Sequence, residues 1–206
     1  MKYLYTVALL FLSSVSYAAH PYDSVCSVLT RGSGGSGTLI NNVEGKYGVV
    51  LCVAHVAGTP GEWVSCTWGE TTCEGICWKV YKQADICLLL VASPPGLRPV
   101  EVALPDPANE PFVLAGFPSY SRRKLHFQTG TFRGVGRNTS PQITEVMSRN
   151  YVLSYPPSQR MGVLADFKYD TLFTNCAPWS GMSGGACFDQ RGRVVGTVST
   201  AHPSIK

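Results

Sequence analysis

Charged residues are scarce in this sequence of 206 residues: they make up 15% of it, against about a quarter in an average globular domain. No internal repeat and no low-complexity segment is visible. The 21 glycines and 14 prolines, together with the low charge, favour a turn-rich β protein over a helical bundle. With 45% hydrophobic residues and a mean hydropathy of +0.06, the chain can bury a substantial core, which excludes an intrinsically disordered protein.

Basic charge is also limited. The formal net charge is +4 and the isoelectric point is about 8.6, which is too little to imply a nucleic-acid partner without a concentrated basic patch. The nearest approach to such a patch is Arg122, Arg123 and Lys124, and three adjacent charges are more typical of a solvated loop. We therefore expect no nucleic-acid partner.

The N-terminus carries the one segment that resembles a targeting signal. Lys2 precedes an apolar run over residues 7–12, and small residues follow at Ser16 and Ala18. This pattern predicts a signal peptide over residues 1–18, cleaved after Ala18, and the run is too short to span a bilayer. We expect a secreted or extracytoplasmic protein without stable membrane insertion; an uncleaved membrane anchor is the alternative.

Eight cysteines follow the predicted leader, at positions 26, 52, 66, 73, 77, 87, 176 and 187. An even number in an exported protein predicts disulfide bonds, although their pairing cannot be chosen from the sequence. Cys66, Cys73 and Cys77 could instead suggest zinc, but they include no CxxC pair and no nearby histidine at ligand spacing. Cys52 and Cys87 lie inside apolar runs, where buried free thiols are the alternative.

Short apolar runs bounded by glycine, proline or asparagine predict two sets of strands. The first set covers residues 36–40, 47–54, 62–68, 76–81 and 85–91, and the second covers 112–117, 126–132, 151–155, 186–189 and 193–200. A proline-rich connector at 93–111 separates the two sets. The sequence therefore predicts two antiparallel β units, over residues 19–100 and 101–206.

Three short segments contain residue types that together form a hydrolytic site. Ser183 is flanked by glycines in SGMSGG, which permits a tight turn whose N–H groups can face a substrate oxygen. A serine hydroxyl needs a base and a group that orients the base. His55 closes the run VVLCVAH and Asp85 opens DICLLLV, so both are expected at strand ends. Each motif alone also fits a glycine loop, a partly buried histidine or a turn aspartate.

The order and context of these segments resemble the chymotrypsin-like (trypsin-like) serine peptidases. The matching segments are GSGTLI, VLCVAHV, ADICLLLV and GMSGGACFDQRGRVVGTVS, from about residue 33 to the end, in the order His, Asp, Ser. They are closest in type to short bacterial and viral members, including glutamyl-endopeptidase and HtrA-like domains. The resemblance implies an all-β fold of two six-stranded antiparallel barrels with the active site in the cleft between them. Because only AHPSIK follows the last predicted strand, we expect the chain to continue past Lys206 or another segment to complete the second barrel.

The resemblance also implies roles for individual residues. Ser183 matches the nucleophile, His55 the general acid and base, and Asp85 the group that orients the imidazole. The backbone N–H groups of Gly181 and Ser183 match the oxyanion hole. Met182 stands where trypsin-type enzymes have an aspartate that binds a new N-terminus, so activation by that route is not expected. The family requires no cofactor and no metal.

Four residues are expected to bind substrate. Ser199 matches the serine beside the catalytic aspartate, and Thr200 and Ala201 match the strand edge that pairs with the substrate backbone. Ala177 takes the place of the acidic specificity residue of trypsin-type enzymes. Val198 falls where glutamyl endopeptidases have a histidine. We therefore expect uncharged, small or apolar residues on the acyl side of the scissile bond.

These expectations lead to one main hypothesis, an exported serine endopeptidase that hydrolyses protein or peptide substrates through an acyl-enzyme. A non-catalytic binding module on the same fold is an alternative, because fold does not establish function. A protease segment of a viral polyprotein is another. Asn138 begins a glycosylation sequon, which matters only in a eukaryotic secretory route. The sequence does not indicate an oligomeric state.

Overall fold

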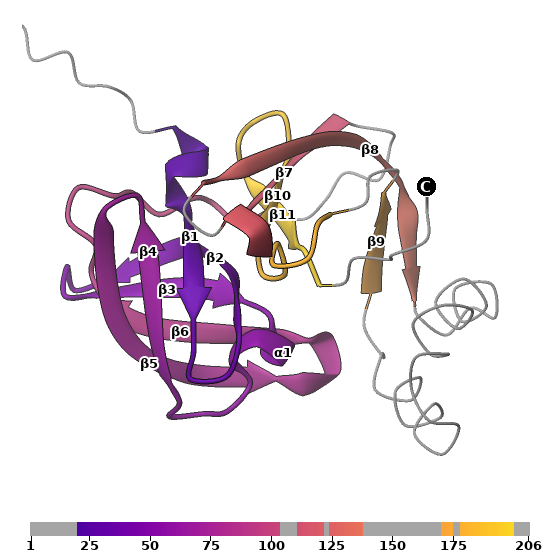
Figure 1. The fold of residues 1–206 in the computed structure, drawn as a ribbon. Coiled ribbons are helices and arrows are strands. Elements are labelled where there is room, and N and C mark those ends of the chain that lie inside the picture. Colours follow the sequence, from indigo (N-terminus) through magenta and orange to yellow (C-terminus); the bar gives the residue numbers. More distant parts are fainter. Residues whose placement is uncertain (1–19, 104–110, 122–123, 138–169, 175–177, 200–206) are drawn as a thin grey trace, which may run out of the picture.

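The computed structural model describes residues 20–103, 111–121, 124–137, 170–174 and 178–199. In these residues the chain forms a closed six-stranded antiparallel barrel and a separate five-stranded sheet (Figure 1). Helix is limited to short turns, η1 (Pro21–Ser24), α1 (Ala54–Ala57), η2 (Lys82–Ala84) and η3 (Ser119–Ser121). The all-β fold in two parts that the sequence predicts is confirmed. The predicted signal peptide (1–18), Arg122, Arg123, the glycosylation sequon and the predicted strand 151–155 lie outside the described residues.

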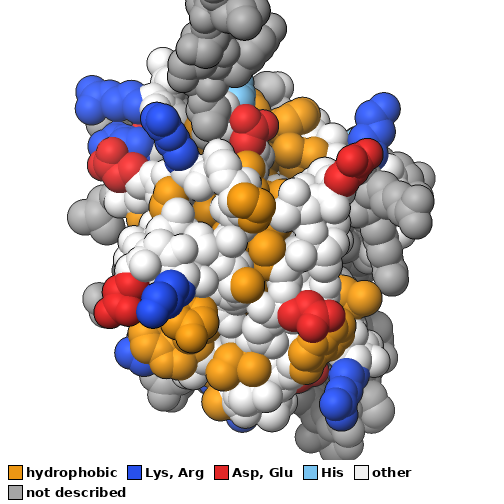
Figure 2. Space-filling view, turned by 90° about the vertical axis from the view of Figure 1, so that its left-hand side faces the viewer, with side chains coloured by type: hydrophobic (Ala, Val, Ile, Leu, Met, Phe, Trp, Pro, Cys, Tyr) orange, Lys and Arg blue, Asp and Glu red, His pale blue; other side chains and the backbone are white. Residues whose placement is uncertain are grey.

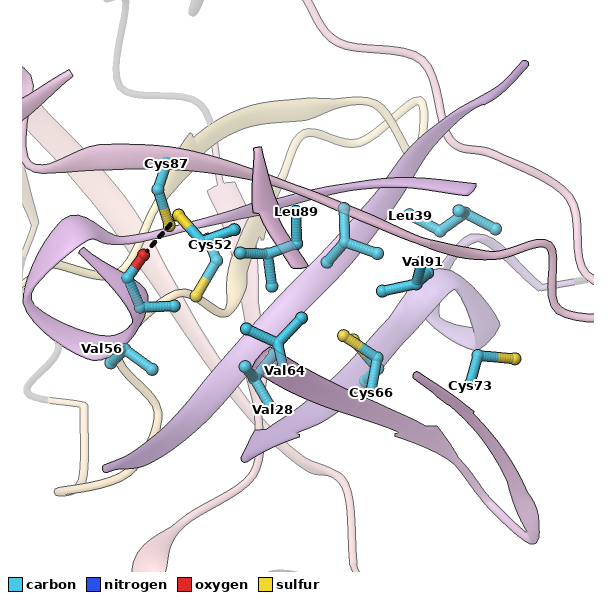
Figure 3. Packing of buried hydrophobic residues seen from close by; sticks show 14 of the residues in the cluster. Val28, Leu39, Cys52, Val56, Val64, Cys66, Cys73, Cys87, Leu89 and Val91 are labelled. Carbon is cyan, nitrogen blue, oxygen red and sulfur yellow. Dashed lines mark hydrogen bonds between the residues drawn. The ribbon is translucent and has the colours of Figure 1, made fainter. Parts of the chain in front are cut away.

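The barrel is built from the first part of the chain. Its strands are β1 (Val25–Leu29), β2 (Gly34–Val43), β3 (Tyr47–Cys52), β4 (Trp63–Trp68), β5 (Thr71–Tyr81) and β6 (Ile86–Ala92), in the spatial order β1-β2-β3-β6-β5-β4. Alternate residues of β6 are buried, namely Cys87, Leu89 and Val91. This two-residue period is that of a strand with one face in a core. Figure 3 shows these side chains meeting Val28, Leu39 and Val64 inside the barrel.

Two details of the barrel differ from the sequence prediction. Strand β1 was not predicted, because VCSVL is only five residues long and buries Val25 and Cys26 in succession, so it has no clean alternation. His55 was expected to close β3, but that strand ends at Cys52 and His55 lies in α1. The strand thus ends before the histidine, and the short helix α1 follows it.

The predicted disulfides are not found among six cysteines in the described part of the chain, where Cys26, Cys52, Cys66, Cys73, Cys77 and Cys87 are free thiols. Strand register supplies the reason for Cys52 and Cys87, which lie directly opposite each other. The N–H of Ala54 donates to the carbonyl of Asp85, also directly opposite it, so that pair is hydrogen-bonded. Hydrogen-bonded pairs recur every second residue, so Cys52 and Cys87 form one as well. Their Cβ atoms are then about 5.5 Å apart, beyond the 3.5–4.5 Å that a disulfide needs.

The second part of the chain forms the sheet β11-β10-β7-β8-β9. Its strands are β7 (Pro111–Gly116), β8 (His126–Arg137), β9 (Asp170–Thr174), β10 (Ala186–Phe188) and β11 (Val194–Thr197). A core cluster joins the sheet to the barrel: Val25 of β1 lies with Ala115 and Phe188, and Ile40 and Leu51 pack against this cluster. The interface between the two parts therefore includes an apolar cluster.

On the face in Figure 2, basic side chains stand in small, separated groups and form no continuous patch. Among the described helices, none is long and apolar enough to cross a membrane.

Candidate active site

Two neighbouring strands bring His55 and Asp85 together. Cys52 at the end of β3 lies opposite Cys87 of β6, so the chain leaves β3 towards His55 at the same end where Asp85 precedes β6. The Nδ1 atom of His55 lies 2.8 Å from Oδ2 of Asp85. The backbone N–H of His55 donates to Oδ1 of the same carboxylate at 3.0 Å. The carboxylate therefore binds both the ring and the main chain of the histidine.

This contact fixes the tautomer of the imidazole. An ionised carboxylate only accepts hydrogen bonds, so Nδ1 must carry the proton that it shares with Asp85. The other ring nitrogen, Nε2, then keeps its lone pair when the ring is neutral. The side chain of His55 is 45% exposed and that of Asp85 is 14% exposed. The imidazole of His55 thus faces solvent, whereas the carboxylate of Asp85 is largely shielded.

Asp85 is held in its ionised form. Burial alone would raise the pKa of this carboxyl, but hydrogen bonds from His55 and Ser199 and the charge of His55 outweigh burial, so the pKa of Asp85 is lowered. The Ser199 hydroxyl donates to Oδ2 at 2.5 Å. The backbone of Asp85 is left-handed, with φ of 49°, a conformation that aspartate and asparagine tolerate better than most other residues. A strained backbone position of this kind is frequent at functional sites.

Ser183 lies on a tight loop just before β10. Gly181 and Gly184 have φ of 92° and 85°, values that glycine adopts without steric cost. The fully buried side chain of Met182 anchors the loop in the core of the second sheet. Within the described residues, neither the N–H of Gly181 nor that of Ser183 donates a hydrogen bond to the protein. The loop therefore presents two main-chain donors beside the serine.

The Ser183 hydroxyl is not hydrogen-bonded to His55 in this structure. It donates to the backbone carbonyl of Ser199, at 3.4 Å. Ser199 therefore contacts both halves of the site, since its carbonyl accepts from Ser183 while its hydroxyl donates to Asp85.

The predicted site residues can be sorted by what the structure places together. His55 and Asp85 are in direct contact, and Ser199 joins Asp85 to Ser183. The predicted substrate-binding residues Ala177, Thr200 and Ala201 lie outside the described residues, as does Cys176. Val198 is buried in the core of the second sheet rather than open to solvent.

Two hollows adjoin the site. A cavity of about 790 Å³ runs from Gly181 past Gly35 along the barrel to Thr67 and Glu70. A smaller, more open one of about 470 Å³ lies beside His55. Both volumes are in the range of ligand-binding clefts, about 300–1,000 Å³. One hollow thus borders the serine loop at Gly181 and the other borders His55.

Sequence reasoning missed one residue with contacts to this loop. Ser36 of β2 hydrogen-bonds both Gly181 and Ser183. It lies within the GSGTLI segment that carries the family resemblance, but nothing in the local sequence indicates a partner 145 residues away.

Residues 35–196 match the family model of the trypsin-like peptidase domain. The chain belongs to the trypsin-like peptidase family. The resemblance noted in the sequence is thereby confirmed, and the family acts on proteins or peptides. No curated protein sequence matches the chain.

Several solved structures share the fold of this chain. The active form of the Rv3671c protease from M. tuberculosis aligns with a TM-score of 0.65 and 20% identity, over 89% of this chain and 72% of that one. An inactive form of Rv3671c gives a TM-score of 0.62 and 23% identity, over 88% and 79%. Deg5 gives 0.59 and 18%, over 87% and 80%. At these identities the similarity establishes a shared fold.

Proposed function

We propose that this trypsin-like peptidase is a serine endopeptidase that cleaves peptide bonds through an acyl-enzyme, with Ser183 as nucleophile. The observation that carries the proposal is the hydrogen-bonded chain from Ser199 through Asp85 to His55. It leaves Nε2 of an exposed imidazole as a proton acceptor. Ser199 also joins Ser183 to this chain, and Ser183 lies on a loop whose two main-chain donors have no partner among the described residues.

The first half of the reaction forms the acyl-enzyme. The Ser183 hydroxyl leaves the carbonyl of Ser199 by rotation about its Cα–Cβ bond. It gives its proton to Nε2 of His55 as its oxygen attacks the substrate carbonyl carbon. The N–H groups of Gly181 and Ser183 donate to the oxyanion that forms. Asp85 stabilises the imidazolium, which then protonates the amine of the leaving peptide as the C–N bond breaks.

The second half repeats these steps with water. His55 takes a proton from the water molecule as the water oxygen attacks the ester carbonyl of the acyl-enzyme. The ring then returns that proton to Ser183, which releases the acid product and restores the neutral tautomer. No other reactant is needed.

Substrate selection follows from the residues at the end of β11. We infer that Ser199, Thr200 and Ala201 pair with the substrate backbone and that Ala177 brings no charge to the acyl-side pocket; Val198, which is buried in the core, contributes no charge either. We infer a preference for small or apolar residues there, with about 1–3 kcal/mol of discrimination for size. A cleavage profile of a peptide library dominated by Lys, Arg or Glu would contradict this preference.

The test of the nucleophile is covalent labelling by a fluorophosphonate, followed by intact mass and peptide mapping. We expect one adduct, on Ser183, and no adduct in S183A. The matched control is S180A, because Ser180 is an exposed serine on the same loop; it should label like the wild type. A folded wild-type protein that remains unlabelled would refute the peptidase and favour the binding module.

Turnover tests the base independently. S183A and H55A should each lose about 10⁴- to 10⁶-fold in kcat, and the double variant little more, because the two residues act as a unit. Losses that add in the double variant would show that His55 does not serve Ser183.

A further inference from the structure

Ser36 connects the barrel to the nucleophile loop. It lies on β2 and is completely buried. Its N–H donates to the carbonyl of Ser183 at 2.7 Å, and its hydroxyl donates to the carbonyl of Gly181 at 3.1 Å. The same hydroxyl accepts from the N–H of Phe117 at 2.8 Å, while the Ser36 carbonyl accepts from the Cys52 thiol at 3.2 Å. Every polar group of this serine is therefore engaged.

The two loop carbonyls that Ser36 binds flank one peptide group. The Gly181 carbonyl belongs to the peptide between residues 181 and 182, and the Ser183 carbonyl belongs to the one between 183 and 184. Between them lies the peptide whose N–H is that of Ser183. The carbonyl of this same peptide, that of Met182, accepts from the N–H of Gly185 at 2.8 Å. Because Ser36 holds the peptides on both sides of it, the direction of the Ser183 N–H depends on these three bonds together.

The other oxyanion donor is fixed in a related way. The N–H of Gly181 belongs to a peptide whose carbonyl, that of Ser180, accepts from the N–H of Ser119 at 2.8 Å. Gly181 has φ of 92°, and glycine changes its backbone angles at little cost. The bond from the Ser36 hydroxyl to the Gly181 carbonyl therefore restrains the most adaptable residue of the loop.

Neighbouring backbone and side-chain atoms pack closely around Ser36. A Cβ atom on Gly116 would lie 3.1 Å from Ser36 Oγ and 3.2 Å from Cβ of Met182. A Cβ atom on Gly184 would lie against the Ser36 carbonyl. The proton of the hydroxyl has a single direction, since Phe117 donates to the oxygen and Gly181 accepts from it. The site thus matches a hydroxyl that donates and accepts at once.

We propose that Ser36 is a positioning residue whose hydroxyl holds the Gly181–Ser183 backbone in the conformation that binds the oxyanion. The inference rests on the serine peptidase proposed above. Ser36 does not touch the reacting atoms. It acts by keeping two main-chain donors directed to the place where negative charge develops, which is the requirement for electrostatic stabilisation of the transition state.

The test is S36A, which removes one oxygen atom and leaves the backbone bond to Ser183 in place. Loss of a single oxyanion donor costs about 10²- to 10³-fold in kcat, so loosening the donors should cost about 10- to 100-fold, with KM changed less than threefold. Affinity for a peptide aldehyde, which forms a tetrahedral adduct, should fall in parallel with kcat. The pH profile of kcat should keep its shape, because His55 and Asp85 are untouched.

The matched control is T38V. Thr38 is fully buried two residues along the same strand, and its hydroxyl has no hydrogen-bond partner in the described part of the chain. Removing that hydroxyl should leave kcat and aldehyde affinity unchanged. Thermal unfolding of both variants separates the two effects: a purely structural role of the Ser36 hydroxyl would lower the stability of S36A while its kcat stays at the level of T38V.

The outcomes separate the two proposals. If wild type reacts with the fluorophosphonate and S36A matches T38V in kcat and aldehyde affinity, the role of Ser36 is refuted while the peptidase stands. If wild type does not react, the proposed function fails first. Should S36A not fold, S36C replaces it: a thiol is a weaker donor of similar shape, so kcat should fall about 3- to 10-fold, and an unchanged kcat would overturn the inference.

Discussion

Replacing Asp85 with asparagine tests the link between the hydrogen-bond geometry and the chemistry. The change keeps the size and shape of the side chain and removes its charge and one acceptor atom. Asparagine also tolerates the left-handed backbone found at this position, φ of 49°. D85N should therefore fold, and its effect should be confined to the contacts of this side chain with His55 and Ser199.

The asparagine side chain cannot satisfy both contacts with His55. Oδ1 of Asp85 accepts from the backbone N–H of His55, and Oδ2 accepts from Nδ1. If the amide oxygen takes the place of Oδ1, the NH₂ group donates to Nδ1 and forces the proton onto Nε2, which can then no longer accept from Ser183. If the amide is turned over, its NH₂ group faces the backbone N–H at the 3.0 Å now spanned by that hydrogen bond.

The magnitude follows from these two states. Leaving a donor facing a donor costs about 1–3 kcal/mol, so the working orientation is the minor one. The imidazolium of the transition state also loses a charged hydrogen-bond partner, about 1.5–3 kcal/mol. Together these losses come to about 2.5–6 kcal/mol, which is a fall in kcat of about 10²- to 10⁴-fold at 1.36 kcal/mol for each factor of ten.

The assay is steady-state turnover of a peptide substrate, with thermal unfolding to show that the variant is folded. D189N is the matched control, because Asp189 is a buried aspartate that accepts from Arg193 in the turn between β10 and β11. D189N should lose about 1–2 kcal/mol of stability and keep its kcat. A D85N protein within fivefold of wild type in kcat would refute the assignment of Asp85.

Three further outcomes are expected. The pKa values of Asp85 and Asp189 are both lowered, because burial, which raises them, is outweighed by the hydrogen bonds that each carboxylate accepts. The folding stability that these two carboxylates contribute is therefore present above the unfolded-state pKa of about 3.9 and is lost as pH falls through their lower folded-state pKa values. Urea unfolding from pH 6 to 2 should show this loss. The free energy of unfolding should fall less steeply with decreasing pH in D189N than in the wild type. Gly184→Ala should cost more than about 1–2 kcal/mol, because φ is 85° and a Cβ atom would press on a β2 carbonyl; a melting temperature equal to wild type would contradict the packing. Alkylation in denaturant without reductant should label Cys52 and Cys87 as free thiols, whereas a peptide pair lighter by two hydrogens would show a disulfide.

The sequence located much of this architecture because strand periodicity and short motifs are local signals. Apolar runs predicted five of the six barrel strands, and the SGMSGG loop with its two glycines at positive φ placed Ser183 on a tight turn. Strand β1 escaped because VCSVL lacks alternation. His55 was predicted at a strand end but lies in a helical turn. The prediction was wrong because the apolar run VVLCVAH contains no residue that marks the end of the strand.

Two features could not be predicted from the sequence, because both depend on contacts between residues far apart in the chain: the state of the cysteines and the role of Ser36. The number of cysteines predicted disulfides, but whether two thiols can bond depends on register, and register puts Cys52 and Cys87 in a hydrogen-bonded pair. Likewise, Ser36 looked like part of a glycine-rich strand. Its importance emerges only when β2 packs against a loop 145 residues away in the chain.

The bonds from Ser36 to the nucleophile loop have a consequence for how the molecule can change over evolution. His55, the proposed base, follows β3 of the closed barrel, and these bonds fasten the serine loop to that same barrel, although the loop comes from the other half of the chain. The proposed base and nucleophile are therefore both attached to the barrel. Strands β8 and β9 lie beyond β7 in the second sheet and make none of these bonds, so substitutions there can accumulate without disturbing the distance over which the proton must travel.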